Sequence, residues 1–171
     1  MNVTELNVTK RLGAASFALA LSVATGALAA PPSPTLPTVG TLTISAPFGS
    51  SPVLAWSWGA SNSGTTNVGG GGGAGKANIQ DLSLTRYADG QSPLFFNAVA
   101  KGQHLASVVL VAGSTTITLM DVLVASYSTG DSSPEGKPTT RTENITFNFA
   151  KITYTVNGVA TCFNSSTQSS C

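Results

Sequence analysis

The sequence predicts a mainly β protein with one short α-helix, and two observations carry this prediction. Apolar and polar residues alternate along several short runs, among them residues 82–84, 115–120 and 145–149, and this is the period of a half-buried strand. Only residues 92–102 combine the signals that start and stop a helix. The length of 171 residues favours one domain. Short strands at this spacing argue for a barrel or a sandwich.

The composition agrees with an exported protein, and the first 29 residues resemble a secretory signal peptide. Charged residues make up only 9% of the chain, which is common in exported β proteins. Lys10 and Arg11 precede an uncharged run that ends in a small-x-small motif at residues 27–29. A retained membrane anchor is the alternative, but the run has few strongly apolar residues. We therefore expect a periplasmic or secreted chain that starts near Ala30, with no stable membrane insertion after cleavage.

Cleavage would leave a chain without net charge. It removes Glu5, Lys10 and Arg11, which takes two of the eight Lys and Arg residues and one of the seven Asp and Glu residues, leaving six of each. No basic patch remains that could neutralise a phosphate backbone, so we expect no nucleic-acid partner.

The chain then opens with a linker and two strands. Residues 30–40 contain four prolines and form an extended linker. A short strand follows at residues 41–45, and a second one covers residues 54–59. Trp56 and Trp58 share one face of the second strand. We interpret them as core residues, and the alternative is an outward aromatic platform that stacks on sugars or on a protein partner.

A long glycine-rich loop joins this strand to the next one. Gly70 and Gly75-Lys76 have the spacing of a phosphate-binding loop, but Ala77 stands where that motif needs Ser or Thr. Ordering five consecutive glycines costs much backbone entropy, which a partner would have to offset. We therefore interpret the loop as an assembly element. Its residues include Ser61, Gly69, Gly70, Gly71, Gly72, Gly73, Gly75 and Lys76.

The segment after the loop predicts a strand with a change of phase, followed by the helix. Apolar residues stand at odd positions before Asp81 and at even positions after it, so we expect a β-bulge near Asp81. In the helix at residues 92–102, Ser92 is the expected N-cap, Pro93 fits the first position, and Gly102 suits the position past the end.

Further strands fill the rest of the chain. Residues 105–112 are apolar on both faces and predict a strand buried on both sides. We expect strands at 115–120, 122–128 and 141–149, and a final one at 152–156. The expected core is Leu82, Leu84, Val109, Ile117, Leu119, Ile145, Phe147, Phe149 and Tyr154.

No set of residues predicts catalysis or a cofactor. His104 is the only histidine, with no second His or Cys near it in the sequence, so we interpret it as a satisfied residue at a strand edge. Asp81, Asp89 and Asp121 fall on the bulge, on a turn and at a strand start, where carboxylates commonly accept backbone hydrogen bonds. We expect no enzyme, no metal and no cofactor.

The last segment, residues 158–171, is a polar tail with two cysteines. In an exported chain Cys162 and Cys171 suggest a disulfide. The alternative is two thiols that are free or that pair between chains. We expect the tail to be mobile.

A series of motifs resembles a known family over residues 41–156. The motifs follow in order: LAWSWG (54–59), the glycine loop, QDLS (80–83), SPL (92–94), GQH (102–104), DVLV (121–124), SYSTG (126–130) and TENITFNFA (142–150). Together they are similar to the haemolysin-coregulated protein (Hcp) family, the tube subunit of bacterial type VI secretion.

The resemblance implies a fold and two hypotheses for function. The fold is an Hcp-like β-barrel of two packed antiparallel sheets with one short flanking α-helix, spanning residues 41–157. The first function is a structural subunit that forms six-membered rings and stacked tubes, carries or accompanies effectors, and meets a spike protein. The leader, the short turn at 46–50 and the short hairpin at 112–114 depart from the family. They support the second hypothesis, an exported Hcp-like binding or adhesive module outside the tube.

Overall fold

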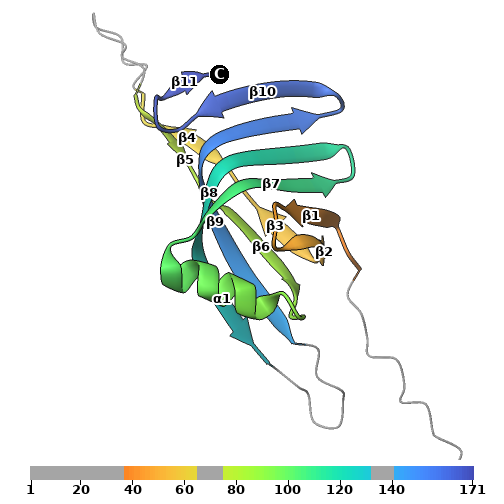
Figure 1. Ribbon diagram of the computed structural model, residues 1–171. Helices are drawn as coiled ribbons and strands as arrows, with labels where there is room; N and C mark the ends of the chain where they lie inside the picture. The colour runs from red at the N-terminus through yellow and green to blue at the C-terminus, as the bar shows by residue number, and fades with distance from the viewer. Residues whose placement is uncertain (1–36, 65–74, 132–140) are drawn as a thin grey trace, which may run out of the picture. The chain divides into compact units, whose positions relative to one another are not determined.

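Eleven strands and one helix form the part of the chain that the computed structural model describes, residues 37–64, 75–131 and 141–171 (Figure 1). The expected leader and the five glycines from Gly69 to Gly73 lie outside the described residues. All described residues belong to one unit, Ser33–Cys171. This described part is mainly β with one helix, as the sequence predicts.

All pairings between the described strands are antiparallel. Their bounds are β1 (Gly40–Ile44), β2 (Gly49–Val53), β3 (Ala55–Ser57), β4 (Ala60–Asn62), β5 (Ala77–Ile79), β6 (Leu82–Tyr87), β7 (His104–Ala112), β8 (Thr115–Gly130), β9 (Thr142–Val156), β10 (Val159–Asn164) and β11 (Ser169–Ser170). Nine of them form one sheet, and β4 and β5 form a separate two-stranded sheet.

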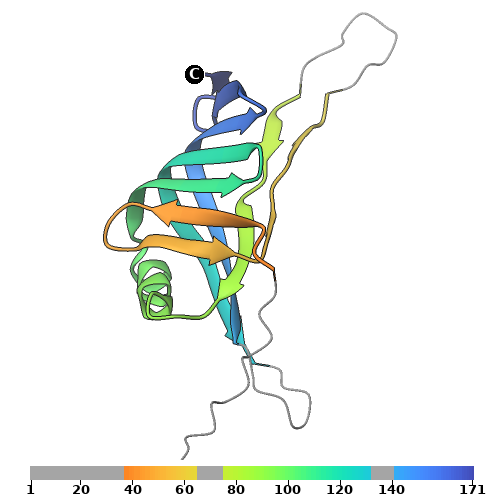
Figure 2. The same cartoon turned by 90° about the vertical axis from the view of Figure 1, so that its right-hand side faces the viewer.

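One path of paired strands crosses the large sheet, and β6 with β3 branches from it at β9. It runs from β9 through β8, β7 and β1 to β2, and Figure 2 shows β1 and β2 in orange beside β7. Only Leu54 separates β2 from β3, and its N–H donates to the carbonyl of Thr85 on β6 at 2.8 Å. Strand β3 pairs with β6, which pairs with the N-terminal half of β9. The C-terminal half of β9 pairs with β10 instead.

The helix α1 (Ser92–Lys101) packs against β8 and buries Phe95 and Ala98. It ends as predicted, because Gly102 takes the left-handed conformation and its N–H donates to the carbonyl of Val99. The expected N-cap is wrong: the capping residue is Gln91, and the Ser92 hydroxyl accepts the N–H of Asp89 instead.

Most of the expected core is buried, but two members are not. The fully inward residues include Leu82, Ile117 and Phe147, each with no exposed surface. Val109 and Tyr154 are half-buried. Strand β7 presents Leu105, Val108 and Leu110 to the core and Val109 and Val111 outward, so the prediction that β7 is buried on both sides is wrong. Within the described residues, no second layer covers its outer face.

The change of phase near Asp81 has another cause than a bulge. The chain breaks at Gln80-Asp81 into β5, which pairs with β4, and β6, which pairs with β3 and β9. The two phases therefore belong to two different sheets. The register irregularity lies elsewhere, in β8 between Val124 and Ser126.

The C-terminal segment is more ordered than the sequence suggests. The two strands expected at residues 141–149 and 152–156 are one continuous strand, β9 (Thr142–Val156). The tail then turns back and pairs as β10 along residues 151–156, with Phe163 packed against the core. The prediction of a mobile tail is wrong, because backbone pairing and an apolar anchor hold it to the sheet.

Candidate assembly surface

One outward face of the large sheet is broad and uncharged. Cross-strand pairing aligns its side chains in two rows that each cross β1, β7, β8 and β9. We call it the threonine–valine face, and its residues are Thr41, Val111, Thr116 and Thr155 in one row and Thr43, Val109, Thr118 and Thr153 in the other.

This face has the character of a surface that packs against protein. Val111 is 46% exposed although it is apolar, and none of the eight side chains can carry a charge. Charged residues are depleted at the centre of protein interfaces, where desolvation would cost much. The threonine hydroxyls can donate and accept hydrogen bonds, so they can satisfy a neighbouring backbone.

A groove of about 660 Å³ borders this face where the sheet meets the C-terminal hairpin. Ala106, Met120 and Ala150 line it together with Lys151 and the two cysteines. Asp121 and Lys151 place two charged side chains in this lining, so the groove marks the border of the uncharged threonine–valine face.

The outward face of the other half of the sheet carries mainly hydroxyl groups. The Ser83 and Thr146 hydroxyls lie 3.2 Å apart, and the Thr85 hydroxyl donates to the Asn144 side-chain oxygen at 2.6 Å. We call it the hydroxyl face. Its residues, in two rows, are Ala55, Thr85, Asn144 and Ser128, and Ser57, Ser83, Thr146 and Ser126.

The described ends of the glycine loop meet at a closed base. Ser61 pairs with Asn78 across β4 and β5. The Asn62 amide donates to the carbonyl of Gly75 at 2.9 Å, and the Asn62 side-chain oxygen accepts the N–H of Gly64. A Cβ at Gly75 would lie 2.6 Å from the Gly64 nitrogen, so only glycine fits there. Lys76 is exposed beside this base.

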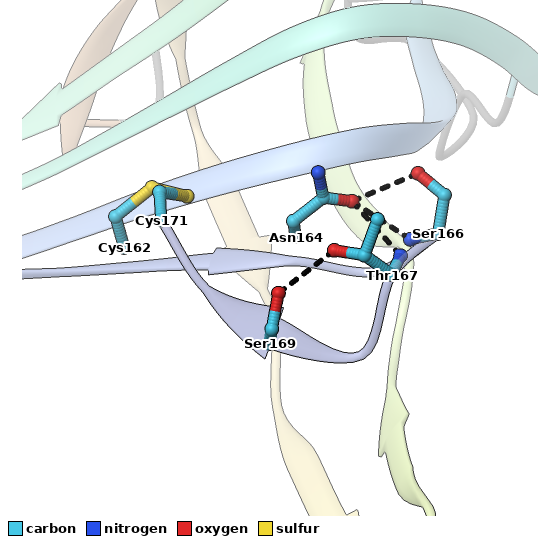
Figure 3. The surroundings of a disulfide bond; sticks show 6 residues. All are labelled: Cys162, Asn164, Ser166, Thr167, Ser169 and Cys171. Atoms are coloured by element: carbon cyan, nitrogen blue, oxygen red, sulfur yellow. Dashed lines mark hydrogen bonds between the residues drawn. A yellow bond between two sulfur atoms is a disulfide. The ribbon is translucent and has the colours of Figure 1, made fainter.

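The tail ends in a small closed hairpin, which Figure 3 shows. A disulfide joins Cys162 to Cys171, and β11 pairs with Phe163 and Asn164 at the end of β10. The Asn164 side-chain oxygen accepts hydrogen bonds from the backbone of Ser166 and of Thr167, which hold the turn.

The two tryptophans support the core interpretation. Trp56 and Trp58 are half-buried and pack against the core, and the Trp58 ring lies 5.2 Å from that of Tyr154. They do not form an outward platform, so the sugar-stacking alternative has no aromatic surface at this strand.

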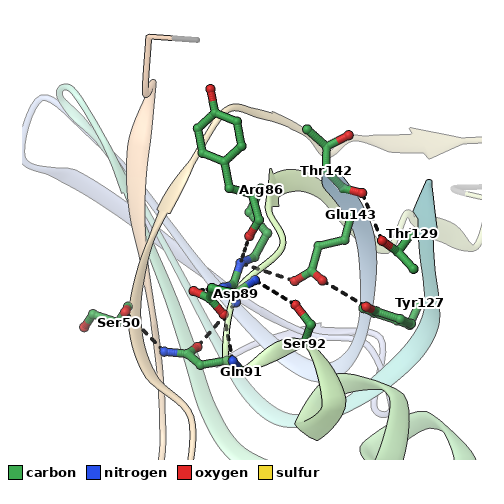
Figure 4. Close-up of polar contacts among 10 residues, drawn as sticks. Ser50, Arg86, Asp89, Gln91, Ser92, Tyr127, Thr129, Thr142 and Glu143 are labelled. Atoms are coloured by element: carbon green, nitrogen blue, oxygen red, sulfur yellow. Dashed lines mark hydrogen bonds and ion pairs between the residues drawn. The ribbon is translucent and has the colours of Figure 1, made fainter. Parts of the chain in front are cut away.

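A buried polar cluster holds β6, β8 and β9 to the start of the helix (Figure 4). The Arg86 guanidinium lies 3.4 Å from the Glu143 carboxylate and forms a second ion pair with Asp89. The Tyr127 hydroxyl donates to Glu143 at 2.9 Å. Burial raises the pKa of Tyr127 above its ordinary value, and the hydrogen bond and negative charge of Glu143 raise it further.

The sequence interpretation overlooked this cluster, although a signal was present. Arg86 has the same phase as Leu82 and Leu84, and Glu143 the same phase as Ile145. Two opposite charges at inward positions of separate strands indicate a buried pair.

The single histidine and the other aspartates have ordinary partners. His104 Nδ1 lies 2.9 Å from the Asp121 carboxylate, and both side chains are about two-thirds exposed, at 69% and 67%. Asp81 accepts the Asn148 amide, and Asp89 accepts the N–H of Gln91. Within residues 37–64, 75–131 and 141–171, no three His, Cys, Asp or Glu side chains gather as a metal site requires. The helix in these residues is too short to cross a bilayer.

Comparison with known proteins relates this arrangement to type VI secretion. The family described as type VI secretion system effector, Hcp, matches residues 40–156. The protein Hcp1 of Pseudomonas aeruginosa is 48% identical over 86 residues, which is 45% of this chain and 51% of that protein. The chain thus matches about half the length of this curated relative.

Solved structures share the fold at low sequence identity. The crystal structure of Hcp1 from Salmonella typhimurium has a TM-score of 0.64 and 19% identity, covering 78% of this chain and 99% of that one. A structure of a type six secretion system protein has a TM-score of 0.67 and 21% identity with the same coverage. A type VI secretion system effector from Yersinia pestis has a TM-score of 0.56 and 22% identity, covering 73% and 98%.

Proposed function

Since this chain belongs to the Hcp family of type VI secretion proteins, we propose that it is a structural subunit that forms rings and stacks into a secretion tube. The ring contains six copies. The tube carries or accompanies effectors and meets a spike protein at its end. The subunit binds no nucleic acid and performs no catalysis.

The observation that carries this proposal is the threonine–valine face. It crosses four strands, it presents Val111 and Val109 outward, and it lacks charge. A monomer gains little from such a face, whereas a subunit that buries it against a neighbour avoids the cost of desolvating charges. We assign this face to the contact between neighbouring subunits.

The glycine loop supplies a second contact in this proposal. Its base is closed by Asn62 and Gly75, so the loop leaves the sheet at a defined place. Five glycines have few means of packing on their own chain, and ordering each costs about 1–2 kcal/mol. A neighbouring subunit or ring would supply the backbone hydrogen bonds that offset this cost.

The signal-like leader and the disulfide favour a second candidate, an exported Hcp-like module that binds or adheres outside the tube. Structural disulfides persist in oxidising compartments, whereas cytosolic proteins rarely contain them. A monomer in solution would favour this candidate, and a ring would favour the tube subunit.

Native mass spectrometry of the purified protein and of Val111→Glu tests the proposal. We expect the parent to form six-membered rings and the variant to lose them, because a carboxylate at the centre of the contact cannot be desolvated without a partner. Ser128→Glu is the matched control, because it places the same charge on the hydroxyl face of β8. A parent that stays monomeric at every concentration would overturn the ring. Rings that persist in Val111→Glu would overturn the choice of face.

A further inference from the structure

The C-terminal hairpin lies beyond the part of the chain that matches the family. The match ends at residue 156, where the two-residue turn Asn157-Gly158 reverses the chain, with φ of 50° and 81°. Positive φ at both positions gives a turn whose twist suits a β-hairpin. Strand β10 then pairs through six residues with β9, so residues beyond the family match extend the sheet by one strand.

The outer edge of β10 lacks the usual protection of an edge strand. Natural edges are blunted by charged residues, proline, bulges or a covering segment. The six residues of β10 include no charge and no proline, and Val159 is 77% exposed. Among the described residues, the only segment that pairs with this edge is β11.

The outer edge of β10 already pairs with an antiparallel strand in this structure. Strand β11 pairs with Phe163 and Asn164, and the N–H of Cys171 donates to the carbonyl of Cys162 at 3.4 Å. The Cys162 carbonyl therefore points away from β9. Because backbone groups alternate along a strand, the N–H and C=O of Ala160 point the same way.

The disulfide is the covalent tie between β10 and the residue after β11, in addition to the hydrogen bonds of Asn164 that hold the turn. A strand of two residues cannot hold an edge by its own hydrogen bonds, and isolated short pairings are unstable in water. The Cys162–Cys171 bond ties the residue that follows β11 to β10 and keeps β11 at a high local concentration.

We propose that the outer edge of β10 is a strand-docking edge, that the disulfide-held β11 occupies it in the oxidised chain, and that reduction opens it to β10 of a second copy. A dithiol reductant supplies two electrons and two protons to the S–S bond. The products are the thiols of Cys162 and Cys171 and the disulfide of the reductant. The redox state of the disulfide thus controls whether the outer edge of β10 is covered by β11 or free to pair.

A second copy is the occupant that fits this edge. Two β10 strands can pair antiparallel about a two-fold axis, so each edge meets an identical one and no complementary sequence is needed. Without charge on either strand, no like-charge repulsion opposes the pairing. This contact lies on β10 and is separate from the threonine–valine face, so its test does not depend on whether the proposed ring forms.

Sedimentation velocity tests this redox control. It compares the oxidised protein, the dithiol-reduced protein and the Cys162→Ser/Cys171→Ser variant. We expect the reduced protein and the variant to shift, with rising concentration, to twice the mass of the oxidised species, whether that species is a monomer or a ring. The double variant cannot form disulfides between chains, so its shift would report strand pairing. Equal masses for all three proteins would overturn the inference.

Two further variants test whether the pairing uses the β10 edge and whether loss of β11 is enough to allow it. Ala160→Pro removes an outward N–H at the edge, where proline is tolerated, and in the double-serine background it should abolish the mass shift. A chain that ends at Asn164 and carries Cys162→Ser lacks β11 and cannot form a disulfide between chains; it should pair as the reduced protein does, which covers the case in which the double-serine variant folds poorly. A mass shift that survives Ala160→Pro would overturn the assignment to β10. A ring that fails to form leaves this result unaffected, because doubling is measured from the oxidised species.

Discussion

The Arg86 guanidinium and the Glu143 carboxylate lie 3.4 Å apart with 1% and 0% of their side chains exposed. Arg86 also lies over the Phe95 ring, 5.2 Å from its centre, and its Nη1 donates to the Gln91 side chain. The pair therefore joins β6, β9 and the start of α1. A buried charge with a partner is tolerated, but a buried charge without one is strongly destabilising.

Removing one charge of this pair should lower stability markedly. Glu143→Gln leaves Arg86 with Asp89 as its remaining ion-pair partner, so we expect the free energy of unfolding to fall by about 3 kcal/mol, the lower end for a broken buried pair. Urea denaturation measures this. Arg141→Gln is the control, because its pair with Asp131 is exposed and its loss should cost less than about 1 kcal/mol. Similar losses in both variants would contradict a special role for the buried pair.

Stability should decline at alkaline pH through Tyr127. Because burial and Glu143 raise the pKa of this hydroxyl in the folded chain, the folded state holds the proton more tightly than the unfolded state does. The resulting stability is present below the unfolded pKa of about 10 and is lost as the pH rises through the folded-state pKa. Urea unfolding at a series of pH values should show a steeper alkaline loss in the parent than in Tyr127→Phe. Parallel curves would refute this.

Phe147 should contribute much more to stability than the exposed Phe96. Phe147 is fully buried and contacts the Phe95 ring, whose centre is 6.4 Å away. We expect Phe147→Ala to cost about 3–5 kcal/mol, because it removes apolar burial and leaves a cavity. Phe96 is 63% exposed on α1, so Phe96→Ala should change stability by less than about 0.5 kcal/mol. Denaturant melts compare the two, and a loss below about 1 kcal/mol for Phe147→Ala would place that ring outside the core.

The base of the glycine loop should matter for assembly and not for the stability of the sheet. Gly75→Ala places a methyl group 2.6 Å from the Gly64 nitrogen, which forces the base open. Gly90→Ala is the matched control, because its Cβ would meet nothing within 4 Å. We expect both variants to keep the melting temperature of the parent and only Gly75→Ala to weaken rings or tubes in native mass spectrometry and electron microscopy. Normal assembly of Gly75→Ala would show that the loop base is a passive connection.

The leader should be absent from the mature protein. Lys10, Arg11 and the small-x-small motif at residues 27–29 have the order of a cleaved signal peptide. N-terminal sequencing of protein from the periplasm or the medium should begin at or near Ala30. Protein that begins at Met1 and sediments with membranes would support the retained anchor instead.

Periodicity in the sequence was sufficient for most of the core. Side chains of a strand alternate between two faces, so the spacing of Ile145 and Phe147, or of Ile117 and Leu119, indicates which face is inward before any partner is known. Proline at 93 and glycine at 102 likewise delimit the helix, because their backbone preferences are local.

The pairing partners of the strands could not be predicted from this alternation. Val109 belongs to an apolar run that predicts a strand buried on both faces, yet no layer covers the outer side of β7 within the described residues. The phase change at Asp81 reads as a bulge, yet β5 and β6 belong to different sheets. In both cases the outcome depends on residues far along the chain, which alternation cannot identify.

The sequence by itself determined the class of the fold, the helix and the inward phase of most strands, since these follow from local backbone preference and side-chain spacing, and the order of its motifs carried the resemblance to the Hcp family. Only the tertiary structure decided that Arg86 meets Glu143, that eight Thr and Val side chains align across four strands into one uncharged face, and that the tail becomes an edge strand. These features arise from contacts between residues distant in sequence, and register and burial exist only once the strands have paired and packed around the core.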